Sequence, residues 1–190
     1  MSAAAPSARP RVPVGLALPV LAGIGMLLLR LRILDTPGAT RIVLLTAVFS
    51  AILAASLLVP VAPGVARARP WLVTLIGLAG VAVASFLAGR PISAPLGAWA
   101  LPLAILAAVA EEALFRRAAY GRLERYRAAV AVVGSALLFA AVHLPLYGAA
   151  ALPVDLGAGL LFSWQRWASG TWTVPAGTHA AANVVAVILR

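Results

Sequence analysis

Seven long apolar stretches follow one another along the chain, separated by short polar or charged segments. They cover about residues 12–34, 42–61, 71–88, 96–115, 128–146, 149–164 and 172–189. A helix needs roughly 20 apolar residues to cross a membrane. The pattern therefore predicts an all-α polytopic membrane protein, a bundle of about seven transmembrane helices. The sixth stretch is short and contains Pro153 and Asp155, so we expect it to be tilted, broken or partly re-entrant.

The composition excludes a soluble globular domain. The mean hydropathy is +1.03 and only 11% of the residues are charged, whereas soluble domains contain about 25%. Cysteine is absent, which excludes thiolate metal sites and cysteine catalysis. No internal repeat is visible, so we interpret residues 1–190 as a single transmembrane domain. The residues that carry chemistry lie in its second half, at about 96–189.

The net charge of +10 comes from arginine, because the chain has no lysine. With a cytoplasmic N-terminus, ten arginines lie on the cytoplasmic side. The five on the far side are Arg30, Arg32, Arg41, Arg90 and Arg190. This excess favours that orientation, and it argues against nucleic acid as the partner. We expect the first apolar stretch to be a retained span rather than a signal peptide.

Two of the five acidic residues, Glu111 and Glu112, are adjacent in the fourth apolar stretch. An ionisable group in a membrane helix costs several kcal/mol unless it has a partner, so a function is the default explanation. The only two histidines, His143 and His179, also lie in apolar stretches. Either histidine alone fits a helix–helix hydrogen bond, and the glutamates alone fit the start of a loop. Together they indicate an active site inside the bundle.

Helical spacing predicts which of these side chains are neighbours, because residues four apart share a face. The pairs are Glu112 with Arg116, Phe139 with His143, and His179 with Asn183. Glu111 is rotated by about 100° from Glu112, so we expect one carboxylate to be structural and the other to face the bundle interior. An antiparallel hairpin that turns near residue 127 would bring Glu111 and His143 to similar depth. This requires the fourth helix to continue beyond Phe115.

Three short motifs carry a resemblance to a known family. Residues 111–116 read E-E-A-L-F-R, residues 139–143 read F-A-A-V-H, and residues 179–183 read H-A-A-A-N. In this order on successive membrane helices, they resemble the CPBP (CAAX protease and bacteriocin-processing, or Abi) family of intramembrane proteases. The family usually has a small residue after the motif arginine, where this chain has Arg117. That departure concerns the packing there rather than the catalytic set.

The resemblance implies proteolysis within the membrane, and the roles of the residues follow by position. Glu111 is expected to activate water with the help of His143, and His179 with Asn183 to stabilise the oxyanion. The supporting residues are Glu112, Arg116 and Phe139. If a metal takes part, its ligands would be Glu111, His143 and His179, with zinc as the candidate. A metal-free glutamate mechanism fits the residues as well and is slightly favoured.

The resemblance also implies a peptide or protein substrate, membrane-anchored in part of the family, and a place in a cell membrane that we expect to be bacterial. One alternative is a catalytically idle relative that acts as a scaffold or bacteriocin-immunity protein. A scaffold would not need four polar groups whose burial in lipid costs free energy, which argues against this alternative. The other alternative is a small transporter, which also needs intramembrane glutamate and histidine. Such carriers usually contain inverted repeats, and the sequence shows none.

Overall fold

The computed structural model describes residues 18–88 and 97–188, and this part of the chain is helical, with no strand. Its α-helices are α1 (Leu18–Ile33), α2 (Gly38–Leu58), α3 (Pro70–Ala88), α4 (Ala100–Glu112), α5 (Tyr120–Leu123), α6 (Ala128–Tyr147), α7 (Leu152–Ser169) and α8 (Thr173–Ile188). Two 3₁₀ turns, η2 (Gly97–Trp99) and η4 (Ala149–Ala151), precede α4 and α7, and a π-helix, η3 (Ala113–Ala119), joins α4 to α5. The predicted start of the first stretch at residue 12 lies outside the described residues.

Each of the seven predicted stretches contains a helix, so the all-helical architecture is confirmed. The fourth stretch continues as predicted beyond Phe115, because α4, η3 and α5 follow one another to Leu123. The sixth stretch is not broken. Pro153 lies in the first turn of α7, where its missing N–H donor leaves no helical hydrogen bond unmade, and the helix runs on to Ser169.

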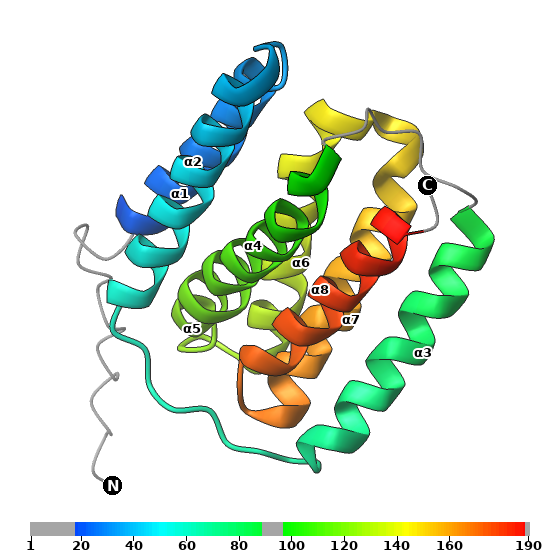
Figure 1. Ribbon diagram of the computed structural model, residues 1–190. Helices are drawn as coiled ribbons and strands as arrows, with labels where there is room; N and C mark the ends of the chain where they lie inside the picture. Colours follow the sequence, from blue (N-terminus) through cyan, green and yellow to red (C-terminus); the bar gives the residue numbers. More distant parts are fainter. Residues whose placement is uncertain (1–17, 89–96, 189–190) are drawn as a thin grey trace, which may run out of the picture.

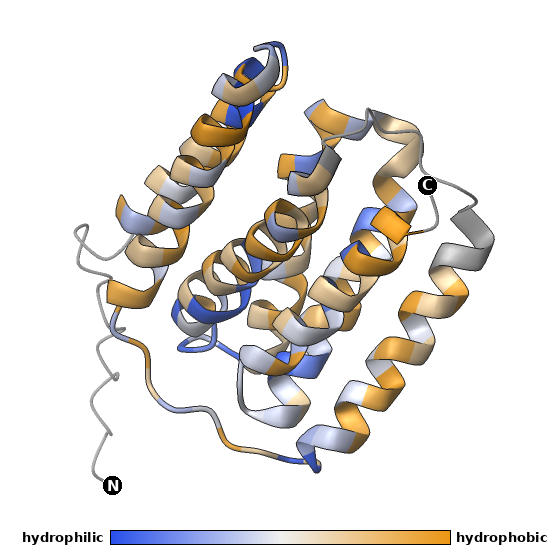
Figure 2. Ribbon diagram, viewed as in Figure 1, coloured by the Kyte–Doolittle hydropathy of each residue, from blue (hydrophilic) through white to orange (hydrophobic). Residues whose placement is uncertain are grey.

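Two of the described helices, α2 and α6, are long and apolar enough to cross a membrane by length and composition. In the described residues α3 and α8 are apolar but shorter. Large apolar side chains point outward on several helices, such as Trp71 and Leu137, which are 58% and 53% exposed. Figure 2 shows hydrophilic residues gathered at the turn between α1 and α2 and around α5. That all seven segments cross a membrane stays a prediction.

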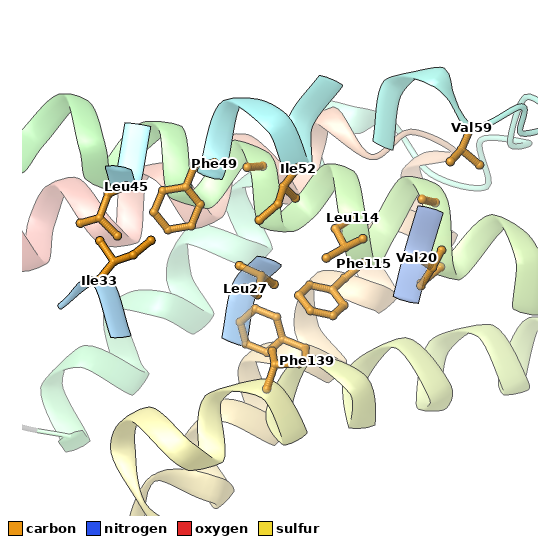
Figure 3. Packing of buried hydrophobic residues seen from close by; sticks show 14 of the residues in the cluster. Val20, Leu27, Ile33, Leu45, Phe49, Ile52, Val59, Leu114, Phe115 and Phe139 are labelled. Carbon is orange, nitrogen blue, oxygen red and sulfur yellow. The ribbon is translucent and has the colours of Figure 1, made fainter. Parts of the chain in front are cut away.

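Helix α4 lies in the middle of the bundle, between α2 on one side and α8 on the other (Figure 1). Helix α6 packs along α7, α3 covers α7 and α8, and α1 forms a hairpin with α2. Leu27 of α1 belongs to the same buried cluster as Phe115 of η3 and Phe139 of α6 (Figure 3). The core therefore joins α1 to the helices that carry the first two motifs.

The loop between α2 and α3 is fixed to the end of α7. The backbone N–H groups of Arg67 and Ala68 donate to the carbonyl of Ala168 at 2.8 and 3.0 Å. Gly170 ends α7 with a φ of +74°, and a Cβ there would lie 2.7 Å from the backbone nitrogen of Ala66. Arg166 of α7 lies 3.8 Å from Glu124, at the end of α5. Three arginine-bearing segments thus meet at one end of the bundle.

Candidate active site

The two adjacent glutamates end α4, and both are buried, with 3% of Glu111 and 0% of Glu112 exposed. They contact different helices. Glu111 reaches α1 and α6, whereas Glu112 reaches η3 and α8. This divergence follows from the rotation of about 100° between neighbouring residues of a helix.

Glu111 lies between a cation and an imidazole. Its Oε1 accepts a hydrogen bond from Nη1 of Arg30 at 2.6 Å, and its Oε2 is 3.6 Å from Nε2 of His143. The predicted meeting of Glu111 and His143 is confirmed, at a separation slightly too long for a direct hydrogen bond. Nδ1 of His143 lies 2.8 Å from the carbonyl of Phe139 and must donate to it. In a neutral ring Nε2 is then an acceptor that faces Glu111.

Glu112 binds two partners and is fully enclosed. Its Oε2 is 3.2 Å from Nε of Arg116, so the predicted ion pair is confirmed. Its Oε1 is 3.0 Å from Nδ1 of His179. The spacing of residues along the chain does not show which of the two glutamates is the partner of His179.

Arg116 is the largest fully buried side chain among the described residues. Its guanidinium lies over the ring of Phe139 at 4.6 Å and over that of Phe162 at 5.5 Å. Its Nη2 donates to the carbonyl of Gly159 at 3.0 Å. A Cβ on Gly159 would lie 3.0 Å from backbone atoms of Ala136, so a glycine allows α6 and α7 to approach closely here. Arg116 therefore fastens η3 to α6 and α7.

His179 and Asn183 share a face of α8, as their spacing predicts. The ring of His179 stacks on Phe162, with centroids 4.9 Å apart and planes inclined by 19°. Asn183 lies one turn further along and donates Nδ2 to the carbonyl of Ala104 at 3.0 Å. Asn183 therefore contacts the backbone of α4 rather than a carboxylate, and its amide keeps a second hydrogen for another acceptor.

The motif arginine lies in the π-helix, a rare conformation that recurs at functional sites. The carbonyl of Arg116 accepts a hydrogen bond from Nε of Arg166 at 3.2 Å. The next residue, Arg117, points to the opposite side, where its Nη1 donates to the carbonyls of Ser56 and Val59. These carbonyls end α2, where a helix attracts cations. Arg117, which departs from the family pattern, therefore caps the C-terminal end of the neighbouring helix α2.

A comparison with known families bears on this geometry. Residues 92–185 match the family described as type II CAAX prenyl endopeptidase Rce1-like, and the match includes all three motifs. This half of the chain belongs to the Rce1-like family. The predicted membership among CAAX-type intramembrane proteases is confirmed at the level of the family, which is embedded in membranes. No curated protein and no solved structure matched the chain.

The predicted metal ligands of the Rce1-like domain do not form one cluster. Within residues 18–88 and 97–188, no group of three or more His, Asp or Glu side chains is placed to hold a metal ion. His143 and His179 pair with different glutamates, and each uses Nδ1 in a hydrogen bond. A catalytic zinc site needs three protein ligands around one ion. Glu111, His143 and His179 do not fit that requirement in this geometry.

Two residues beside the Rce1-like site were missed by the sequence analysis. Arg30, counted there among the far-side arginines, is only 7% exposed and pairs with Glu111. Its position inside the first apolar stretch was a usable signal, because a cation in an apolar helix needs a partner. Asp155, in the first turn of α7, lies within electrostatic range of His143, Glu111 and Arg30.

Proposed function

We propose that this Rce1-like protein is an intramembrane endopeptidase that hydrolyses a peptide bond with water activated by Glu111 and His143. One observation carries the proposal. Oε2 of Glu111 and Nε2 of His143 face each other at 3.6 Å, while the second polar atom of each side chain is held by Arg30 or by the carbonyl of Phe139. A water molecule at hydrogen-bond distance from both atoms, about 2.8 Å, fits this separation.

The proposed reaction follows from these contacts. The water oxygen attacks the carbonyl carbon while Glu111, assisted by His143, accepts a proton. The negative charge on the former carbonyl oxygen is then stabilised by the second amide hydrogen of Asn183 and by Nε2–H of His179. The latter requires the imidazolium form of His179, because its Nδ1–H already donates to Glu112. The accepted proton passes to the nitrogen of the leaving peptide as the C–N bond breaks. The water hydroxyl ends on the carbon and its proton on the amine.

Glu112 and Arg116 take no part in this proton transfer. Their ion pair is fully buried, and it joins η3 to α8 through His179 and to α7 through Gly159. We propose that this network fixes the position of Glu111, because Glu112 is its direct neighbour in the chain. Phe139 supports both halves, since it holds Nδ1 of His143 and lies under the guanidinium of Arg116.

We further propose that the seven helical segments span a bilayer with the N-terminus on the cytoplasmic side. The gathering of Arg67, Arg166 and the end of α5 at one end of the bundle supports this orientation. The family description names CAAX prenyl endopeptidases. We therefore propose a protein or peptide substrate that is cleaved near its C-terminus and is itself held at the membrane.

The test is cleavage by the purified protein in liposomes. The probes are a fluorogenic peptide with a farnesylated C-terminal CAAX sequence and the same peptide without the farnesyl group. We expect the wild type to cleave at least the farnesylated probe, and Glu111→Gln to be inserted and folded but inactive. Activity in Glu111→Gln together with none in Glu112→Gln would assign the base to Glu112. A wild type that cleaves neither probe would count against this substrate class.

Metal independence is a separate part of the proposal. It rests on the observation that His143 lies near Glu111 whereas His179 pairs with Glu112. Dialysis of the active enzyme against a chelator should leave its rate unchanged, and added zinc should not raise that rate. Loss of activity with the chelator and recovery with zinc would overturn the metal-free mechanism while leaving the peptidase function intact.

A further inference from the structure

Arg30 carries more hydrogen-bond donors than Glu111 uses. It lies on α1, outside the family match at residues 92–185, and its side chain is buried. Nη1 donates to Glu111, whereas Nε and Nη2 are buried and find no partner among the described residues. These two nitrogens form one edge of the guanidinium fork, with two parallel N–H donors. Leaving such donors unmet costs free energy that a bound acceptor would recover.

A second buried polar atom without a hydrogen-bond partner among the described residues belongs to Asp155 of α7. It is Oδ2 of the carboxylate. Asp155 interacts electrostatically with Arg30, Glu111 and His143, yet the ion pairs of the described residues include none between Asp155 and Arg30. An acid in the first turn of a helix is favoured by the helix dipole. The dipole does not explain why the oxygen is buried without a donor.

The charges around these groups indicate what they would bind. Arg30 contributes one positive charge, and Glu111 and Asp155 contribute two negative charges. A carboxylate bound here would therefore meet more repulsion than attraction. A neutral group that offers both an acceptor and a donor fits better, and a peptide backbone offers a C=O and an N–H.

We propose that Arg30 and Asp155 form a main-chain clamp for the substrate, in which the fork of Arg30 donates to a backbone carbonyl and Asp155 accepts from a backbone N–H next to the scissile bond. The clamp rests on the proposed peptidase function and extends it. Because it contacts the backbone, it holds substrates of different sequence in the same way. Its contacts are made before the water attacks, so they strengthen substrate binding rather than the transition state alone.

The first test uses variants of the clamp on a fluorogenic peptide that the wild type cleaves. Arg30→Lys keeps the charge beside Glu111 but removes the fork, and Asp155→Asn removes the charged acceptor. A hydrogen bond to a charged group is worth about tenfold or more in binding. We expect both variants to raise KM by about that factor. Asp155→Asn should keep kcat close to wild type, whereas Arg30→Lys should also lower kcat, because Arg30 holds Oε1 of Glu111. Arg32→Lys and Asp35→Asn, both exposed, are the matched controls and should match the wild type.

The second test changes the substrate backbone. In a series of peptides, one amide at a time is replaced by an ester, which removes a single N–H. At one position the ester should raise the wild-type KM about tenfold, and it should have no further effect in Asp155→Asn. Amidation of the peptide C-terminus should change nothing. A loss confined to peptides with a free terminal carboxylate would overturn the clamp and make Arg30 a carboxylate site.

A third measurement separates the clamp from the chemistry. Binding of the same peptide is measured by fluorescence anisotropy in the inactive His143→Gln background, which leaves Arg30 and Asp155 in place. Added Arg30→Lys or Asp155→Asn should weaken this binding about tenfold. Unchanged binding, or a fall in kcat at constant KM, would overturn the clamp. If the wild type cleaves no peptide but peptide binding still depends on Arg30 and Asp155, the proposed function alone would be overturned.

Discussion

The two adjacent glutamates belong to two halves of the site that differ in burial and in the distance from each carboxylate to its histidine. In the Glu112 half, the carboxylate is 0% exposed, binds His179 at 3.0 Å and pairs with Arg116 at 3.2 Å. In the Glu111 half, the imidazole of His143 stays 3.6 Å away. Two identical neighbours on a helix, rotated by about 100°, can therefore have different roles, according to what each one faces.

Energetics explain why the supporting half is so enclosed. Breaking a buried ion pair leaves an uncompensated charge, which costs about 3–5 kcal/mol. Arg116 also gains from the faces of Phe139 and Phe162, which attract a cation. In the proposed mechanism the Glu111 half binds water and substrate, so its polar groups have to remain available.

The largest effect is expected in the Glu111 half. Glu111→Gln and His143→Gln should each lower kcat by about 10²–10⁴-fold, the usual contribution of general acid–base catalysis. The double variant should lose little more than either single one, because residues that act as a unit are not additive. Steady-state kinetics and thermal unfolding of the three proteins provide the measurement. Additive losses would mean that the two residues act in separate steps.

The next effect belongs to the Glu112 half and concerns stability. Arg116→Ala leaves Glu112 buried without its cation, so we expect a loss of about 3–5 kcal/mol in the free energy of unfolding. Lower expression and an earlier melting transition in detergent would report it. Arg125→Ala, which removes an exposed arginine three residues before α6 begins, is the control. A normal melting curve for Arg116→Ala would show that the two halves do not differ in this way.

Sequence periodicity predicted the contacts that are local in the chain. Spacing of four residues gave the pairs of Glu112 with Arg116 and of Phe139 with His143, and hairpin register gave Glu111 with His143. The contact of Arg30 with Glu111 joins residues 81 positions apart, and no periodic rule relates two such helices.

Two further features of the site were also beyond the sequence pattern. The pairing of His179 with Glu112 depends on which carboxylate faces α8, which the order of the segments does not determine. The π-helix at Ala113–Ala119 was not indicated by the periodicity, and the carbonyl of Arg116 within it accepts a hydrogen bond from Arg166 of the distant α7. In each case the missing information lies in the packing of helices that are distant along the chain.

A third prediction tests whether α8 contributes to chemistry as well as support. If His179 and Asn183 donate to the oxyanion, the alanine variants should each lose about 100- to 1000-fold in kcat at nearly constant KM. His179→Ala should also lower the melting temperature, since Glu112 loses a partner. The metal content of both variants and of the active wild type is measured in parallel. Zinc present in the wild type and lost only in His179→Ala would replace the oxyanion role by metal binding.

The smallest effect is expected at Arg117. Arg116 and Arg117 are a second pair of identical neighbours that face different parts of the molecule. Arg116 faces the site, whereas Arg117 faces the carbonyls that end α2. Arg117→Ala removes a charged cap, so we expect a loss of about 1–2 kcal/mol in stability with an unchanged kcat. Arg117→Lys should recover part of that stability, because an ammonium group still favours a helix C-terminus. A fall in kcat at normal stability would place Arg117 with the reactive half instead.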